Sequence, residues 1–284
     1  MTDRRNDGRP PQGRPPGPHR PGSRPGHRPF SAGPRRDAGG RAGNQAGADR
    51  FAVLYGWHPV VQALGNAARG LHRLLATENA AARLEAEFGG ALRITPELVR
   101  PSEIGRLLGP DAVHQGLYLE AEALPAPGLD DLPADALLLA LDQITDPHNV
   151  GAIVRTAAAF GVAGIVTTAR HAPGATGVLA KSASGGLEHV PFVTVRNLAE
   201  ALIALGERGF TRVGLDSDAP ESLDALTIAR PLVIVLGAEG KGLRERTRGC
   251  CDVLARIPFS GAIRSLNVSN AAAITLYALG RIPA

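Results

Sequence analysis

Two loops near the C-terminus carry residues that could build a small-molecule site. The first, residues 237–242, is Gly-Ala-Glu-Gly-Lys-Gly, and it follows an apolar, β-branched run at 233–236 that is typical of a buried parallel strand. The second, residues 257–270, places polar side chains just before an alanine-rich helix: Ser265, Asn267, Ser269 and Asn270. Glycine lets backbone groups approach a ligand closely. Open α/β sheets bind ligands beyond the carboxyl ends of their strands, so these loops predict such a site.

The glycine spacing excludes two common nucleotide-binding loops. Residues 237–242 form G-x-x-G-x-G, which is neither the dinucleotide order G-x-G-x-x-G nor the phosphate-binding G-x-x-x-x-G-K-[ST]. Taken alone, a glycine loop is as consistent with a structural turn as with a ligand site. The second polar loop favours the ligand site.

A third polar stretch ends in Asn149, and Arg155 follows six residues later. An arginine on a helix is ordinarily a solvated surface charge, and Asn149 could simply cap its helix. Asp142 and Asp146 are as consistent with turn residues as with ligands. His148 permits an acid–base role, which is the less favoured interpretation.

The segments around these residues read as alternating strands and helices. The patterns predict strands at 136–141, 164–168, 190–195, 211–216 and 231–236, and helices at 151–160, 175–184, 198–208 and 271–279. This alternation predicts an α/β domain over residues 136–284 with a parallel sheet.

A smaller α/β module is predicted over residues 51–123. Its expected strands are 51–56, 72–76, 92–95 and 113–121, and its expected helical segments are 57–68, 80–88 and 96–108, the last broken near Pro101. Residues 124–135 contain prolines between small residues, which indicates a linker.

The basic charge of the chain is concentrated in its first fifty residues. They hold eleven arginines, no lysine and four aspartates, a net charge of +7, whereas residues 51–284 hold 20 basic and 23 acidic residues, a net charge of −3. Their Pro, Gly and Arg content predicts a disordered tail. This tail could be an electrostatic arm for RNA or a dispensable solvated extension.

The composition also indicates where in the cell the protein is expected. No apolar stretch is long enough to span a bilayer, and the N-terminus lacks the apolar core of a signal peptide. Cys250 and Cys251 are adjacent, which suits neither a loop-closing disulfide nor a metal site. We therefore expect a cytoplasmic protein without a metal.

The three polar stretches resemble the three motifs of the SpoU (TrmH-like) branch of the SPOUT RNA 2′-O-ribose methyltransferases. Residues 141–157 resemble motif 1, residues 235–243 motif 2, and residues 257–271 motif 3. Residues 54–64 and 114–116 resemble the ends of the L30e-like RNA-binding domain that precedes the catalytic domain in a subgroup acting on a guanosine of 23S rRNA. Only the arginine-rich tail lies outside the resemblance.

This resemblance implies a C-terminal trefoil knot, a homodimer formed through the knot, and S-adenosylmethionine (AdoMet) as cofactor. The residues then expected to bind AdoMet are Leu236, Gly237, Ala238, Gly240, Ile257, Pro258, Leu266 and Ser269. Many of these contacts would come from the main chain.

The implied reaction is attack of a ribose 2′-hydroxyl on the methyl group of AdoMet. The resemblance assigns the activating role to Arg155; because its pKa is high, stabilisation of an alkoxide or phosphate-assisted deprotonation is favoured over proton abstraction. Asn149 would position the substrate or Arg155, and Ser265 and Asn267 would order the loop and orient ribose or cofactor. Glu239 would lie near the sulfonium or fix motif 2.

Other functions and a further surface remain open at this stage. The same chemistry on tRNA, or a non-catalytic RNA-binding factor in ribosome assembly, are the alternatives. Lys181 and residues 184–186 could border an RNA groove or form a structural helix end.

Overall fold

The computed structural model describes residues 51–171, 177–263 and 265–279 of the 284-residue chain. The predicted arginine-rich tail lies outside the described residues. Within them, the strands form two sheets, one of four strands and one of seven. None of the described helices is both long and apolar enough to cross a membrane.

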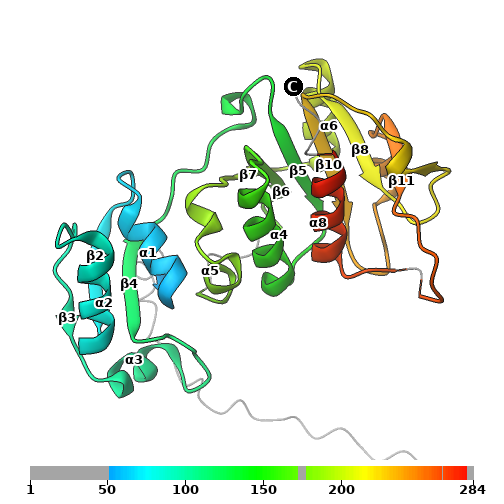
Figure 1. The fold of residues 1–284 in the computed structure, drawn as a ribbon. Coiled ribbons are helices and arrows are strands. Elements are labelled where there is room, and N and C mark those ends of the chain that lie inside the picture. Colours follow the sequence, from blue (N-terminus) through cyan, green and yellow to red (C-terminus); the bar gives the residue numbers. More distant parts are fainter. Residues whose placement is uncertain (1–50, 172–176, 264, 280–284) are drawn as a thin grey trace, which may run out of the picture. The chain divides into compact units, whose positions relative to one another are not determined.

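The four-stranded sheet has the order β1-β4-β2-β3. Figure 1 labels three of its strands, β2, β3 and β4. Its elements are β1 (Phe51–Tyr55), α1 (Trp57–Gly65), β2 (Leu71–Ala76), α2 (Glu78–Phe88), β3 (Glu97–Leu98), α3 (Pro101–Leu108) and β4 (Leu117–Glu122). Strands β1 and β2 pair antiparallel with β4, and β3 pairs parallel with β2. The residues of α1 and α2 share one core with the sheet, whereas Ile104 of α3 packs with Leu75 and Tyr118 in another.

The predicted strand at 92–95 is wrong, and the pairing segment lies two residues later, at β3. Leu92 and Ile94 alternate with polar residues because they pack against the core beside α1 and α2. Arg93, between them, donates hydrogen bonds to backbone carbonyls that follow α1, including that of Arg69 at 2.8 Å. An alternating pattern therefore arose here without strand pairing, and the predicted helical segment 96–108 shortens to α3.

The seven-stranded sheet has the order β7-β6-β5-β10-β8-β11-β9, and all its neighbouring strands are parallel. Its strands are β5 (Leu137–Asp142), β6 (Gly164–Thr168), β7 (Phe192–Val195), β8 (Thr211–Leu215), β9 (Glu221–Ser222), β10 (Leu232–Gly237) and β11 (Val253–Arg256). The helices connected to it are α4 (Pro147–Ala159), α5 (Gly177–Ala183), α6 (Leu198–Glu207), α7 (Glu245–Arg248) and α8 (Val268–Leu279). The predicted parallel sheet is confirmed, whereas β9, β11 and α7 were not expected.

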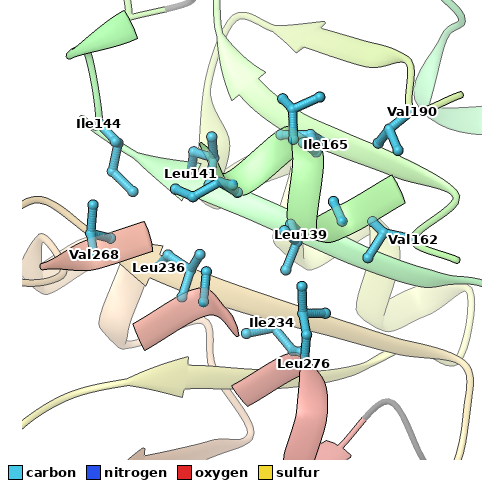
Figure 2. Packing of buried hydrophobic residues seen from close by; sticks show 14 of the residues in the cluster. Leu139, Leu141, Ile144, Val162, Ile165, Val190, Ile234, Leu236, Val268 and Leu276 are labelled. Carbon is cyan, nitrogen blue, oxygen red and sulfur yellow. The ribbon is translucent and has the colours of Figure 1, made fainter. Parts of the chain in front are cut away.

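Strands β5 and β10 are buried on both faces, which explains their continuous apolar sequences. Leu139, Leu141, Ile234 and Leu236 point into a core shared with α4 and α8, as Figure 2 shows. The alternate residues of both strands pack in a second core, which includes α6. Helices α4 and α8 lie side by side over the first core (Figure 1).

Capping residues set the start of the two helices nearest the loops. The Asp146 carboxylate accepts from the backbone N–H of His148 at 3.1 Å, so α4 begins with Pro147, four residues before the predicted start. The alternative of Asn149 as the cap is therefore wrong. The Asn267 side chain accepts from the N–H of Ser269 at 2.9 Å at the start of α8, so Asn267 caps that helix.

Candidate active site

A cavity of about 290 Å³ lies at the carboxyl ends of β8, β10 and β11. Much of its lining follows these strands or leads into α8: Leu215, Asp216, Ser217, Leu236, Gly237, Ala238, Glu239, Gly240, Gly242, Ala255, Ile257, Phe259, Ser265, Leu266, Val268 and Ala271. Carboxyl ends of parallel strands are where open α/β sheets bind ligands. The structure thus brings the glycine loop and part of the second C-terminal loop, residues 257–270, around one cavity.

A tight loop after β10 forms one wall of this cavity. A Cβ atom added at Gly237 would lie 2.3 Å from the carbonyl carbon of Gly242, because the returning chain crosses directly over Gly237. The N–H of Gly242 donates to the carbonyl oxygen of Ala238 at 2.8 Å, and Gly240 and Gly242 have φ values of 75° and 64°. The glycines therefore permit a close approach of the loop to itself and two left-handed backbone positions.

Three side chains from distant parts of the sequence form one hydrogen-bonded network beside the cavity. Asn149 Nδ2 donates to Glu239 Oε1 at 3.3 Å, and Asn149 Oδ1 accepts from Asn267 Nδ2 at 2.8 Å. Glu239 Oε1 also accepts from the backbone N–H of Val268 at 3.1 Å. The first turn of α4, the glycine loop and the start of α8 are thus held together.

Two of the residues predicted to contact a cofactor lie outside the cavity lining. Ser269 donates from Oγ to Asn267 Oδ1 at 2.5 Å, and it thereby supports the network. Pro258 stands between the lining residues Ile257 and Phe259 but does not itself line the cavity. Ser265 and Leu266 do line it.

Arg155 is exposed on α4 and does not line the cavity. Among the described residues its side chain has no hydrogen bond or ion pair with another side chain or with the backbone. Its Cα would lie 3.3 Å from a Cβ added at Gly186, so the short 3-10 helix η3 (Gly186–Glu188) passes beside it. The structure therefore does not bring Arg155 into the Asn149–Glu239–Asn267 network within one chain.

The surface next to the first turn of α4 belongs to α5. Gly151 permits close packing of the two helices, because an added Cβ would lie 2.3 Å from Ser182 Cβ. Ser182 Oγ and His148 Nδ1 are 3.4 Å apart. Lys181 is exposed on the same helix.

Asp216 lines the cavity and was not among the predicted site residues. Its side chain is 13% exposed, and Oδ2 lies 2.9 Å from Nη1 of Arg248, while Oδ1 accepts from the N–H of Asp218 at 2.9 Å. The sequence did contain a signal for this residue, because Asp216 ends the predicted strand 211–216. An acidic residue at the carboxyl end of a parallel strand is placed to face a ligand.

The two cysteines are free thiols. Burial raises the pKa of Cys251 to about 12, so this thiol stays protonated near neutral pH and is a poor nucleophile. Within the described ranges, no three His, Cys, Asp or Glu side chains gather in a way that could hold a metal ion.

Two family models match this chain. The model described as "SpoU rRNA Methylase family" matches residues 136–277, and the model described as "RNA 2'-O ribose methyltransferase substrate binding" matches residues 53–127. The chain belongs to the SpoU rRNA methylase family. The first match contains the cavity, the glycine loop and the network that joins Asn149, Glu239 and Asn267.

Individual SpoU relatives extend the similarity over most of the described chain. A protein of Ralstonia nicotianae named 23S rRNA (guanosine-2'-O-)-methyltransferase RlmB is 37% identical over 232 residues, which cover 79% of this chain and 93% of that protein. A protein of the same name from Nitrosomonas europaea is 50% identical over 149 residues, which cover 52% of this chain and 57% of that relative.

Solved structures show the same fold. The SpoU methyltransferase AviRb from Streptomyces viridochromogenes, solved in complex with the cofactor AdoMet, superposes with a TM-score of 0.70. It is 25% identical, and the superposition covers 85% of this chain and 93% of AviRb. The fold of this chain is therefore shared with a SpoU methyltransferase that was solved with AdoMet bound.

Proposed function

We propose that this SpoU protein transfers a methyl group from AdoMet to the 2′-hydroxyl of a guanosine ribose in 23S rRNA. The observation that carries the proposal is the network joining all three motif stretches at the edge of a ligand-sized cavity. The names of the Ralstonia and Nitrosomonas relatives support the choice of substrate.

The residues of the cavity fit AdoMet. Leu236, Ile257 and Leu266 give it apolar walls suited to an adenine ring, and the crossing at Gly237 leaves backbone groups at its edge. Glu239 and Asp216 give it carboxylates, which suit the cationic sulfonium and amino groups of AdoMet. When bound, AdoMet supplies the electrophilic methyl group.

The protein's part in the reaction is to orient the ribose and to stabilise negative charge on its 2′-oxygen. We assign the second task to Arg155, because a guanidinium stays charged at neutral pH and stabilises a developing alkoxide. Asn149, Ser265 and Asn267 hold the loop that borders both ligands. The free side chain of Arg155 among the described residues is consistent with a partner that arrives with the substrate.

We further propose that the protein is a homodimer whose interface includes α8. Ile274 is 40% exposed and Tyr277 is 58% exposed on this helix, and Ile263 is 78% exposed in the loop before it. Exposed apolar side chains that share one helix and its preceding loop are typical of interfaces. A second copy in that position would also bring further side chains toward the cavity, which Arg155 of the same chain does not line.

The domain division proposed is residues 51–123 as an L30e-like RNA-binding domain, 124–135 as a linker and 136–284 as the methyltransferase domain. The substrate-binding family model supports the first assignment. Insertion of β10 between β5 and β8, both earlier in the sequence, supports a trefoil knot after β10. An RNA substrate of this kind implies a cytoplasmic location.

The test is methyl transfer from radiolabelled AdoMet to unmodified 23S rRNA and to unmodified tRNA. We expect label on the 2′-oxygen of a single guanosine in 23S rRNA. Label on tRNA alone would overturn the choice of substrate. Binding of AdoMet without transfer to any RNA would instead indicate a non-catalytic RNA-binding factor.

Arg155→Ala tests the chemical assignment. It should lower kcat by about 10²–10³-fold, the usual cost of removing one group that stabilises a developing oxyanion, while the Kd for AdoMet stays within about twofold. Arg196→Ala, at another exposed arginine of the same domain, is the control and should keep full activity. Loss of AdoMet binding in Arg155→Ala would contradict the role given to Arg155.

A further inference from the structure

A buried carboxylate lies at the start of the polar stretch that ends in Asn149, next to the start of the glycine loop. Asp142 is the last residue of β5, is fully buried, and is in register with Gly237, the last residue of β10. Acidic side chains are almost never fully buried unless they are paired. The position therefore calls for a partner.

That partner is Arg244. Its Nε donates to Asp142 Oδ1 at 2.7 Å, and its backbone N–H donates to Asp142 Oδ2 at 2.9 Å. Both carboxylate oxygens are thus satisfied by one residue, 102 positions further along the sequence. The Arg244 side chain is 42% exposed, so solvent screens the charge of its guanidinium. The Asp142 carboxylate has no exposed surface and is not screened in this way.

The pair ties together two segments that carry site residues. Arg244 ends the glycine loop and starts α7, where its carbonyl oxygen accepts from the N–H of Arg248 at 2.8 Å. Asp142 leads into Gln143, whose φ of 62° turns the chain toward Asp146 and the start of α4. One ion pair therefore fixes the far end of the glycine loop to the segment that supplies Asn149.

The glycine loop is consequently held at two points. Near its middle, Glu239 accepts from Asn149, and at its end Arg244 binds Asp142. Between the two points stand Gly240 and Gly242 in left-handed conformations, and glycine is the residue with the most freedom to change its backbone angles. Without the second point, only the 3.3 Å hydrogen bond from Asn149 and the bond from Val268 would hold Glu239.

We propose that Asp142 and Arg244 are positioning residues for methyl transfer: they clamp the glycine loop so that the cavity wall and Asn149 keep a fixed relation. The inference rests on the proposed function, because it takes the cavity as the AdoMet site. Neither residue lines the cavity. Their effect on the reaction is exerted through the loop.

The experiment compares Arg244→Ala, Asp142→Asn and the double variant with Arg246→Ala. Arg246 is a matched control, since it is an exposed arginine two residues away whose pairing with Glu200, at 3.5 Å, lies on the surface. Measured for each variant are Tm, the Kd for AdoMet, kcat on 23S rRNA, and hydrogen exchange of the amides in residues 238–243 without cofactor.

Arg244→Ala should lower Tm, because it leaves the Asp142 carboxylate buried with one backbone hydrogen bond. It should also weaken AdoMet binding about tenfold or more, the effect of losing a hydrogen bond to a charged group, and lower kcat by up to about 10²-fold through misplacement. Hydrogen exchange in the loop should accelerate. Arg246→Ala should change none of these quantities beyond twofold.

The double variant separates positioning from mere stability. Replacing the carboxylate by an amide removes the unpaired buried charge, so Tm should recover toward that of the wild type, whereas AdoMet binding and kcat should stay low because the loop is still unclamped. Recovery of all three together would overturn the proposal. If Arg244→Ala does not fold, Arg244→Lys, which keeps the charge but not the planar donor geometry, gives the same comparison.

Hydrogen exchange also keeps the two proposals distinguishable. If the wild-type protein fails to bind AdoMet, the proposed function is wrong, but faster exchange of residues 238–243 in Arg244→Ala than in Arg246→Ala still demonstrates the clamp. If the wild type binds AdoMet but residues 238–243 exchange no faster in Arg244→Ala than in Arg246→Ala, the clamp alone is refuted.

Discussion

Asn149 is the residue at which the three motif stretches meet. Its side-chain oxygen accepts from Asn267, and its side-chain nitrogen donates to Glu239. A side-chain amide can donate one hydrogen bond and accept another at the same time. An ionised carboxylate of the same size only accepts, and an aliphatic side chain does neither. The two hydrogen-bond partners, Glu239 and Asn267, therefore require an amide at position 149.

Asn149→Asp should lower the rate of methyl transfer by about 10²-fold, the order of loss seen when a preorganised polar group of an active site is removed. The change replaces the donor to Glu239 by a second carboxylate, which repels Glu239 and loosens the glycine loop. Initial rates with labelled AdoMet measure the effect. Asn270→Asp, at an exposed asparagine on α8, is the matched control. Equal rates for the two variants would show that the network has no part in transfer.

The element that decides the shape of the cavity is the loop after β10. Gly237 at its start lies against Gly242 at its end. Two residues further on, Arg244 holds the chain by its hydrogen bond to Asp142. The loop is therefore a closed structural unit rather than a flexible glycine tether.

Gly237→Ala should disrupt this unit. The new Cβ would meet the backbone of Gly242 at 2.3 Å, and backbone cannot move aside as a flexible side chain can. Overpacking of this kind costs about 1–3 kcal/mol in the free energy of unfolding, and the displaced wall should abolish measurable AdoMet binding. Calorimetric titration with AdoMet and thermal unfolding check both effects.

Gly261→Ala is the control for this prediction. Gly261 lies in the third motif stretch, and a Cβ added there meets nothing within 4 Å. The variant should bind AdoMet as the wild type does. If Gly237→Ala also bound normally, the tight crossing would not shape the cofactor site.

At the scale of the whole molecule, the charge of the chain is divided unevenly. Residues 1–50 carry a net charge of +7, whereas residues 51–284 carry a net charge of −3. A mildly acidic body gains little from non-specific attraction to RNA. An arginine-rich segment, by contrast, gains affinity through release of counterions from phosphates.

Removal of residues 1–50 should therefore weaken RNA binding chiefly at low salt. The logarithm of the binding constant of the full chain should fall more steeply with the logarithm of the salt concentration than that of the shortened chain. Filter binding to 23S rRNA at about 50–200 mM salt measures both slopes. Equal slopes would show that the segment does not contact phosphates, and unchanged AdoMet binding would confirm that the remaining protein is intact.

The sequence by itself determined the local features and the residues of the network. Strands β5 and β10 were predictable because burial on both faces leaves a continuous apolar run. Asn149, Glu239 and Asn267 were singled out because their stretches resemble three motifs of one family. The boundaries of α4 and α8 were missed by a few residues, because Asp146 and Asn267 act as caps only once the following backbone is helical.

Only the tertiary structure decided which distant residues meet. The insertion of β10 between β5 and β8, the two-residue strand β9 and the pairing of Asp142 with Arg244 have no local pattern that requires them. The structure also separated Arg155 from the cavity within one chain. The physical reason is the same in each case: local propensity depends on neighbours along the chain, whereas strand order and ion pairs depend on contacts between residues far apart in sequence.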